Sequence, residues 1–369
     1  MHETVKLLKD LIGFKTENPP GDEYKVINYV KKFFSKNKIK FKVYSKVKGR
    51  NNIIGYIGQG KPELLVSCHA DTVPVGTGWK TNPFKGVVKN SRVYGRGACD
   101  NKGQLACLLY AAKELKKNES ELNGTFLVGI LADEEKGSQL GLKYLINAKK
   151  IKPNFAILPD IGESMKSIDI AEKGILRLQM SAKGKAAHGS RPQDGENAIV
   201  HLSQAIGKLE GYLLKHKKHR LFSKPTINIG TVQGGDAPNM VPSLAICELD
   251  IRYLPSQNTS KIIKELLAVV NNKKINLKKV IDIPPTELKD MNLVNQIQKT
   301  VKRVLGFKPK PIGLDGGTDA KALLMKGIPA IGYSCGEHSQ MHVPNESIKI
   351  KELEQFSKVL IEIVKDVLN

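Results

Sequence analysis

Residues 125–137 read Thr-Phe-Leu-Val-Gly-Ile-Leu-Ala-Asp-Glu-Glu-Lys-Gly, an apolar run that ends in two adjacent glutamates. A short apolar run of this kind is typical of a strand that is buried on both faces. Open α/β sheets place their ligand sites at the ends of such strands. Neighbouring carboxylates repel each other unless a cation or a proton offsets their charge. The stretch therefore predicts a buried strand that carries Glu134 and Glu135 either to a metal site or to a solvated turn.

Short apolar segments and amphipathic helices alternate on either side of this strand. The expected strands are 53–57, 63–67, 155–158 and 330–333, and the expected helices are 5–12, 26–34 and 104–116, with one more after residue 288. Such alternation predicts an α/β domain whose mixed sheet carries helices on both faces.

The pattern changes near residue 175, where residues 176–180 alternate between apolar and polar like a half-exposed strand. A helix is expected over 198–214, strands over 226–232 and 245–253, and a helix over 260–270. This β-α-β-β-α order suits an open antiparallel sheet with helices on one face. Because 369 residues are many for a single core, we expect a discontinuous main domain at 1–176 and 287–369, interrupted by a smaller α+β domain at 177–286.

The charge of the chain is strongly positive. Lysine and arginine number 59 against 36 acidic residues, which gives a formal net charge of +23. Such an excess can attract nucleic acid, but the lysines are spread along the chain, aromatic residues make up only 6%, and no zinc-finger spacing is present. The basic run 215–220 is short. We therefore expect a solvated, lysine-rich surface that favours a small anionic substrate and no nucleic-acid partner.

Cysteine usage and hydropathy indicate a compartment. The five cysteines form an odd number without regular spacing, which argues against a disulfide framework. No apolar signal core follows the N-terminus, and no apolar run approaches the roughly 18 residues that a membrane helix needs. We expect a reduced, cytoplasmic protein that does not cross a membrane.

Two more polar clusters accompany the first half of the chain. Residues 67–74 contain His69 and Asp71, which point the same way on an extended chain, although such a pair is often structural. Residues 95–103 contain Asp100 among glycines that let the backbone approach a site. An aspartate before a helix is also a common N-cap, so each cluster is ambiguous alone.

Further candidate ligands follow later strands. Asp160 comes directly after the strand expected at 155–158, and His342 lies in the C-terminal stretch 336–346. The candidates together supply two imidazoles and four carboxylates: His69, Asp100, Glu134, Glu135, Asp160 and His342. This mixture suits two zinc ions that share a bridging carboxylate.

These motifs resemble those of the two-zinc metallopeptidases and amidohydrolases, a family that includes acetylornithine deacetylase, succinyl-diaminopimelate desuccinylase, aminoacylase and glutamate carboxypeptidase. The resemblance runs from about residue 5 to the C-terminus. It implies a zinc-hydrolase catalytic domain with an inserted ferredoxin-like lid or dimerisation domain. It also implies two Zn2+ ions, for which Co2+ can substitute, held by His69, Asp100, Glu135, Asp160 and His342.

The resemblance assigns roles to further residues. Glu134 takes the place of the general base, and Asp71 the place of the residue that steadies the first zinc ligand. Many relatives carry Glu-Pro-Thr where this chain has Asp160-Ile161-Gly162-Glu163, so Glu163 is a second candidate for the first zinc site. The resemblance also implies a cis peptide after Asp100.

The resemblance extends to the inserted domain. His188 matches a histidine that reaches the active site of the partner subunit and stabilises the developing oxyanion, which implies a homodimer. Asn239 and Arg252 match residues that bind a substrate carboxylate, and Gly317 and Thr318 match a loop that lines the pocket.

The expected reaction is zinc-dependent removal of an acyl group from an N-acyl amino acid. A dipeptidase or carboxypeptidase is the alternative, and a scaffold that binds ligands without hydrolysing them is a remote third. Desuccinylases often carry Gly-Arg-Arg-Gly before the lid, whereas residues 171–174 here read Ala-Glu-Lys-Gly, which weakens the diaminopimelate assignment.

Overall fold

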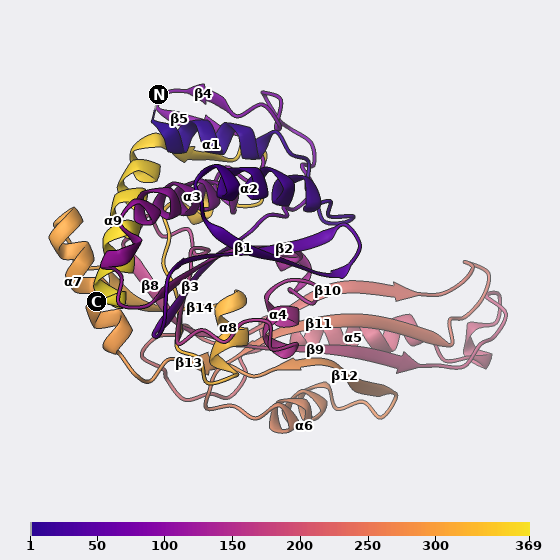
Figure 1. Cartoon of the computed structure of the whole chain (residues 1–369). Helices are drawn as coiled ribbons and strands as arrows, with labels where there is room; N and C mark the ends of the chain where they lie inside the picture. The colour runs from indigo at the N-terminus through magenta and orange to yellow at the C-terminus, as the bar shows by residue number, and fades with distance from the viewer. Residues whose placement is uncertain (1) are drawn as a thin grey trace. The chain divides into compact units, whose positions relative to one another are not determined.

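The computed structural model describes residues 2–369 and divides into two compact units. The first unit contains the chain as far as Ile170, Glu287–Ile312 and Thr318–Asn369, so both ends of the chain belong to it (Figure 1). The second contains Ala171–Thr286 and Gly313–Gly317, and the insertion expected at 177–286 falls inside it.

A mixed sheet forms the centre of the first unit. Within the described residues it has nine strands in the order β1-β2-β6-β3-β7-β15-β8-β13, with β14 paired to β8. The strands are β1 (Lys40–Val47), β2 (Arg50–Gly58), β3 (Glu63–His69), β6 (Thr125–Leu131), β7 (Phe155–Leu158), β8 (Ser167–Glu172), β13 (Thr286–Glu287), β14 (Lys310–Leu314) and β15 (Ala330–Gly332). The β6-β3-β7-β15 block is parallel, and β1, β2 and β8 pair antiparallel, so the prediction of a mixed sheet is confirmed.

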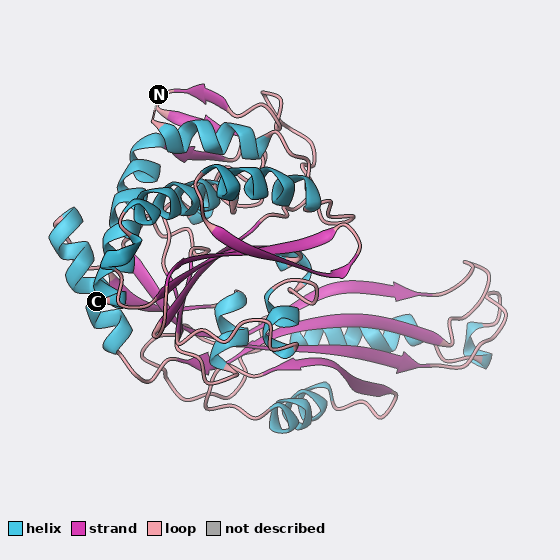
Figure 2. Cartoon of the chain, viewed as in Figure 1, coloured by secondary structure: helices cyan, strands magenta, loops and turns pink. Residues whose placement is uncertain are grey.

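Helices cover both faces of this sheet, as predicted (Figure 2). They are α1 (Glu3–Ile12), α2 (Tyr24–Lys36), α3 (Lys102–Lys117), α4 (Leu142–Asn147), α7 (Asn292–Leu305), α8 (Asp319–Leu324) and α9 (Ile350–Leu368). One core layer joins the sheet to α4 and α8 through Leu142, Leu145 and Leu323. Strand β6 is buried at every position, because both of its faces are covered.

A three-stranded sheet completes the first unit. Its strands β16 (Ser347–Lys349), β5 (Arg92–Tyr94) and β4 (Val87–Lys89) lie in that order. The antiparallel pairing of β16 with β5 brings the stretch after residue 342 beside the stretch before residue 100. These two stretches carry predicted metal ligands, so the small sheet brings parts of the site together.

An antiparallel sheet with two helices forms the second unit. Its strands are β9 (Gly174–Lys183), β10 (Thr226–Gly234), β11 (Leu244–Tyr253) and β12 (Ile275–Ile283), in the order β10-β11-β9-β12. Helices α5 (Ala198–Leu209) and α6 (Thr259–Val270) pack on one face. Alternate residues such as Leu176, Leu178 and Met180 enter the shared core, while Arg177 is exposed. The predicted open sheet with helices on one face is confirmed.

The sequence patterns missed parts of this fold. Strand β12 was not expected, because apolar and charged residues are mixed along 275–283 and most of its side chains remain accessible. Edge strand β1 was missed for the same reason. The helix expected at 198–214 ends at Leu209, and Gly211 follows with φ of 70°, a left-handed conformation that interrupts a helix.

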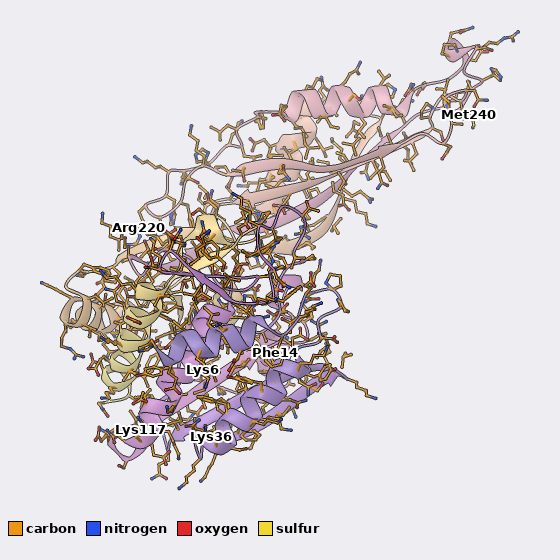
Figure 3. The ribbon with its side chains drawn as sticks, turned by 90° about the horizontal axis from the view of Figure 1, so that it is seen from above. Lys6, Phe14, Lys36, Lys117, Arg220 and Met240 are labelled. Atoms are coloured by element: carbon orange, nitrogen blue, oxygen red, sulfur yellow. The ribbon has the colours of Figure 1, made fainter. Side chains whose placement is uncertain are left out.

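Lysines extend from several surfaces of the first unit. Lys6, Lys36 and Lys117 are exposed on three different helices (Figure 3). The five cysteines are buried and free. In the part of the chain that the structure describes, no helix combines the length and apolar character needed to cross a membrane.

Candidate metal centre

The predicted ligands meet at one edge of the central sheet. Strands β6, β3 and β7 are parallel neighbours, so their carboxyl ends lie side by side. Strand β3 ends at His69, Glu134 and Glu135 follow β6, and Asp160 follows β7. Asp100 joins them from the loop before α3. Parallel strands end on the same side of a sheet, so the ligands that follow β3, β6 and β7 lie close together although up to about ninety residues separate them in the sequence.

Asp100 lies between two imidazoles. Its Oδ1 is 2.9 Å from Nε2 of His69, and its Oδ2 is 3.1 Å from Nε2 of His342. Nε2 of His342 also lies 3.3 Å from Oε2 of Glu135. One carboxylate therefore faces two nitrogen ligands with different oxygens, which is the arrangement that a bridging ligand requires. The peptide bond between Asp100 and Asn101 is cis, as predicted.

A second group of donors shares His69. Oδ1 of Asp160 is 3.8 Å from Nε2 of His69, and the donor atoms of His69, Glu134 and Asp160 all lie within 4.8 Å of one another. The donor atoms of His69, Asp100 and Glu135 meet the same limit. Glu163 instead pairs through its backbone with Glu337.

The electrostatics of the cluster favour a bound cation. Burial and the neighbouring Asp160 raise the pKa of Glu134 well above its usual value. Burial and the charge of Asp100 raise the pKa of Asp160 to about 6. Burial lowers the pKa of His69, but hydrogen bonds with Asp100 and Asp160 outweigh it and raise that pKa overall. Divalent cations would offset this concentration of carboxylates, and imidazole with carboxylate donors suits zinc, so the residues present fit a two-metal site.

Asp71 ties two ligand-bearing segments together. Its Oδ1 accepts the backbone N–H of Glu134 at 3.1 Å, and its Oδ2 accepts that of Glu135 at 3.2 Å. Oδ2 also accepts the side-chain amide of Asn18 at 2.9 Å. The carbonyl oxygen of Asp71 lies 3.0 Å from Nδ1 of His69. Asp71 therefore fixes the backbone of both glutamates as well as lying behind His69.

Glu346 connects two other segments of the site by accepting backbone hydrogen bonds. The sequence patterns did not single out this residue. Its Oε1 accepts the backbone N–H groups of Cys99 at 2.7 Å and Asp100 at 3.0 Å. Its Oε2 accepts the N–H of Gly97 at 3.0 Å and a guanidinium N–H of Arg96 at 2.8 Å. Glu346 is buried, and it joins the stretch that carries His342 to the loop that carries Asp100. The only signal in the sequence was its position four residues after His342.

Two more polar residues, Asn101 and Asp319, lie near the ligands. The side-chain amide of Asn101 donates to Oδ1 of Asp160 at 3.0 Å and thereby orients it. Asp319 lines the same small cavity as Glu134 and Asp160, and it hydrogen-bonds with Ser138. Neighbouring Thr318 caps α8 by accepting the N–H of Ala320. The predicted pocket residue Gly317 ends the short segment 313–317 that belongs to the second unit.

His188 and Asn239 are adjacent in the second unit. The N–H of Gly189 donates to the carbonyl oxygen of Asn239 at 2.7 Å, and His188 forms a β-bridge with Met240. Met240 lies at one end of the long strands of this unit (Figure 3). Nδ1 of the exposed His188 accepts the backbone N–H of Ser190 at 3.1 Å. In the neutral ring this places the proton on Nε2, which is then free to donate.

Arg252 already has a carboxylate partner. Its Nε donates to Oδ1 of Asp250 at 2.7 Å, and Arg177 contacts the other oxygen of the same carboxylate at 3.3 Å. A substrate carboxylate would therefore share the guanidinium of Arg252 with Asp250.

The fold and the donor set define a metal-dependent hydrolase, and comparison with known proteins agrees. A model of peptidase family M20/M25/M40 matches residues 65–366. The chain is 31% identical to an uncharacterised metallohydrolase of Methanocaldococcus jannaschii over 99% of both proteins. It is 27% identical to an acetylornithine deacetylase of Myxococcus xanthus, over 84% of this chain and 81% of that protein. An M20 family metallo-carboxypeptidase of Sulfolobus solfataricus shares the fold with a TM-score of 0.78, at 24% identity over 99% of both chains.

The chain belongs to peptidase family M20/M25/M40. It is a metallohydrolase that acts on amide bonds, as the sequence predicted.

Proposed function

We propose that this protein is a two-zinc amidohydrolase that removes an acyl group from an N-acyl amino acid. The observation that carries the proposal is the position of Asp100, whose two oxygens face Nε2 of His69 and Nε2 of His342. A carboxylate in this position is suited to bridge two metal ions.

The distances suggest how the ligands divide between the two ions. His69 and Asp160 would hold one ion together with Asp100, and Glu135 and His342 would hold the other. Asp160 is favoured over Glu163 because its carboxylate belongs to the group around His69. When bound, two such ions lower the pKa of a shared water and polarise the amide carbonyl.

Glu134 is proposed as the general base. It follows β6 at the edge of the donor cluster, and Asp71 fixes its backbone. A carboxylate held in this way takes a proton from the attacking water and delivers it to the leaving nitrogen. The role of Asp71 is to position Glu134, Glu135 and His69.

The second unit supplies the proposed substrate contacts. His188 presents a protonated Nε2, which is the donor that a developing oxyanion needs. Asn239 lies beside it, and Arg252 offers the planar guanidinium that suits a carboxylate. Gly317 and Thr318 are proposed to line the substrate pocket.

Pairing of two chains through the second unit is part of the proposal. Strand β10 is an edge of its sheet, and large apolar side chains are exposed along it and nearby: Ile199, Val200, Val232, Met240 and Leu244. Exposed apolar patches beside an open strand edge commonly mark protein interfaces, and two-fold pairing is the commonest symmetry.

The choice between a deacylase and a peptidase depends on the substrate. Relatives named as deacylases and relatives named as peptidases both match the chain. Lys173, in the segment where desuccinylases often carry arginines, donates to Ser223 at 2.9 Å and to the carbonyl of Lys224 at 2.6 Å. These contacts make it an anchor inside the second unit and leave the diaminopimelate assignment weak.

Metal removal and a substrate panel test the proposal. We expect a chelator to abolish turnover, and added Zn2+ or Co2+ to restore it. N-acetyl and N-succinyl amino acids and dipeptides should be compared by kcat/KM, with N-acetyl amino acids turned over best. Preference for dipeptides would establish the alternative, and absence of turnover across the panel in zinc-loaded protein would point to a binding scaffold.

A further inference from the structure

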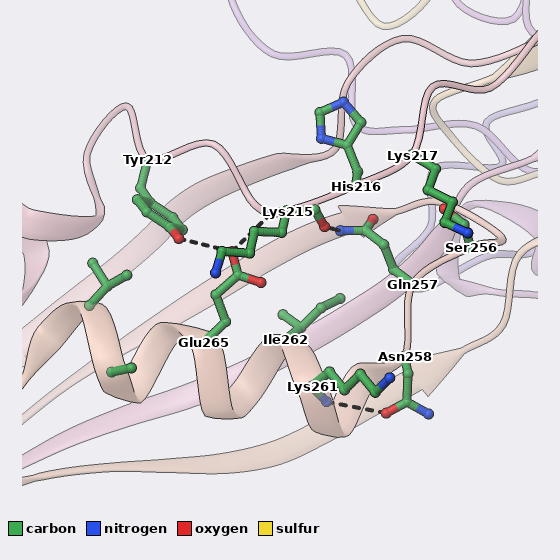
Figure 4. Close-up of a pocket in the computed structure, with 12 residues that line it drawn as sticks. Tyr212, Lys215, His216, Lys217, Ser256, Gln257, Asn258, Lys261, Ile262 and Glu265 are labelled. Atoms are coloured by element: carbon green, nitrogen blue, oxygen red, sulfur yellow. Dashed lines mark hydrogen bonds between the residues drawn. The ribbon is translucent and has the colours of Figure 1, made fainter.

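The second unit contains a cavity of about 720 Å3 beside helix α6 (Figure 4). We refer to it as the α6 cavity. Its wall includes Lys215, Lys217 and Lys261. The first two belong to the basic run 215–220, which was expected to be solvated surface, and Lys261 belongs to α6. Its volume falls within the range of roughly 300–1,000 Å3 that is usual for small-molecule sites.

The wall of the α6 cavity is held in place by hydrogen bonds. Oε1 of Glu265 accepts the hydroxyl of Tyr212 at 2.9 Å and the backbone N–H of Lys215 at 2.8 Å. The side-chain amide of Gln257 donates to the carbonyl oxygen of Lys215 at 2.9 Å and accepts the N–H of Leu254 at 2.8 Å. The main chain at Lys215 is thus fixed on both its N–H and its C=O, so the cavity is largely formed before any ligand binds.

The charges around the α6 cavity are unbalanced. Lys215, Lys217 and Lys261 are exposed, and among residues 2–369 none of their ammonium groups forms a salt bridge with a carboxylate. Among the described residues that line the wall, Glu265 alone carries a carboxylate, and its Oε1 accepts two hydrogen bonds. A negatively charged ligand would therefore meet three lysines against one carboxylate in the wall.

Part of the α6 cavity is apolar. Ile262, Ala268 and Val269 line it along α6, and the ring of Tyr212 borders it (Figure 4). Such a wall suits a flat or aliphatic group, whereas lysine ammonium groups suit phosphate oxygens. We propose that the α6 cavity binds a phosphorylated small molecule with an apolar or aromatic body. None of its wall residues belongs to the proposed catalytic machinery, so this site stands independently of the proposed function.

Calorimetric titration of the full-length, zinc-loaded protein with ATP tests the site, with adenosine and tripolyphosphate as partial ligands. We expect ATP to bind at least about tenfold more tightly than either partial ligand, because only ATP uses both the lysines and the apolar wall. Lys217→Ala combined with Lys261→Ala should weaken ATP binding by about tenfold or more. Lys264→Ala is the matched control, because Lys264 is an exposed lysine on α6 that does not line the cavity.

Because phosphates can also bind at a metal centre, the variants decide the outcome. Ala268→Phe adds a ring to the exposed face of α6 inside the cavity and changes no charge, so it should reduce ATP binding as well. Equal affinity of the double variant and the wild type would overturn the proposal. Equal losses of ATP affinity in the double variant and in the Lys264→Ala control would also overturn it. The same holds if tripolyphosphate binds as tightly as ATP and Ala268→Phe leaves that affinity unchanged.

Discussion

The backbone of Glu134 is held in place by strand β6 and by a hydrogen bond to Asp71. Strand β6 is buried throughout and ends at Leu131, and the carboxylate of Asp71 then accepts the N–H of Glu134. The carboxylate of Glu134 lies within 4.8 Å of the donor atoms of His69 and Asp160. A side chain held in this way needs little reorganisation to accept a proton from a water between the ligands.

We expect Glu134→Gln to keep the fold and the metals yet to lower kcat by about 10²–10⁴-fold, because the amide has nearly the same shape but cannot accept the proton. Metal content by elemental analysis and the far-UV circular dichroism spectrum should not change. Glu121→Gln, on an exposed glutamate, serves as the control and should behave as wild type. A near-normal kcat in Glu134→Gln would remove Glu134 from the role of base.

Strand β6 is buried along its whole length. Phe126 is fully buried on it, whereas Phe307 lies beyond the end of α7 and is 36% exposed. We expect Phe126→Ala to lower the free energy of unfolding by about 3–5 kcal/mol, because it removes buried area and leaves a cavity. Phe307→Ala should lower it by much less, and urea denaturation of both variants measures the difference. Equal losses would show that burial on β6 does not control stability.

The loops around the metal centre depend on one carboxylate. Glu346 accepts backbone N–H groups from Gly97, Cys99 and Asp100, so it holds Asp100 in place from the stretch that carries His342. We expect Glu346→Gln to weaken metal binding by about 10–100-fold, because one of its oxygens becomes an amide donor that faces other donors.

Competition with a metal-binding dye measures this effect without reference to turnover. Glu354→Gln on α9 is the control and should bind metal as the wild type does. If Glu346→Gln loses thermal stability but keeps its metal affinity, Glu346 supports the fold only and does not position the ligands.

At the scale of the whole molecule, the proposed function assigns roles to residues of both units. Glu134 belongs to the first unit, and His188 belongs to the second. If His188 acts across a two-fold interface, each active site combines Glu134 of one chain with His188 of the other.

We expect mixtures of His188→Ala and Glu134→Gln chains to recover activity, because one site of each mixed dimer has both residues intact. Random exchange would make roughly a quarter of all sites active. A mixture of Glu134→Gln with His342→Ala is the control, since both changes affect the first unit and no intact site can form. Sedimentation must first show exchange, and lack of recovery would then mean that His188 does not act in the partner's site.

Local patterns in the sequence were sufficient for several features of this protein. The apolar run 125–131 and the alternation at 176–180 predicted β6 and β9, because burial on both faces gives a continuous apolar run and burial on one face gives alternation. The acidic and histidine clusters after the expected strands indicated a metal site only when taken together, because each cluster alone also fits a solvated turn or a helix cap. The exposed side chains of β1 and β12 leave no such trace, so those strands were missed.

Only the tertiary structure decided how these pieces meet. It placed one oxygen of Asp100 against His69 and the other against His342, and it joined Glu346 to a loop that lies 246 residues away at Asp100. It also placed Lys215, His216 and Lys217 of the basic run in the wall of the α6 cavity. The physical reason is that periodicity reports which side of an element is buried, whereas contacts between distant segments depend on how strands are ordered and paired in the folded chain.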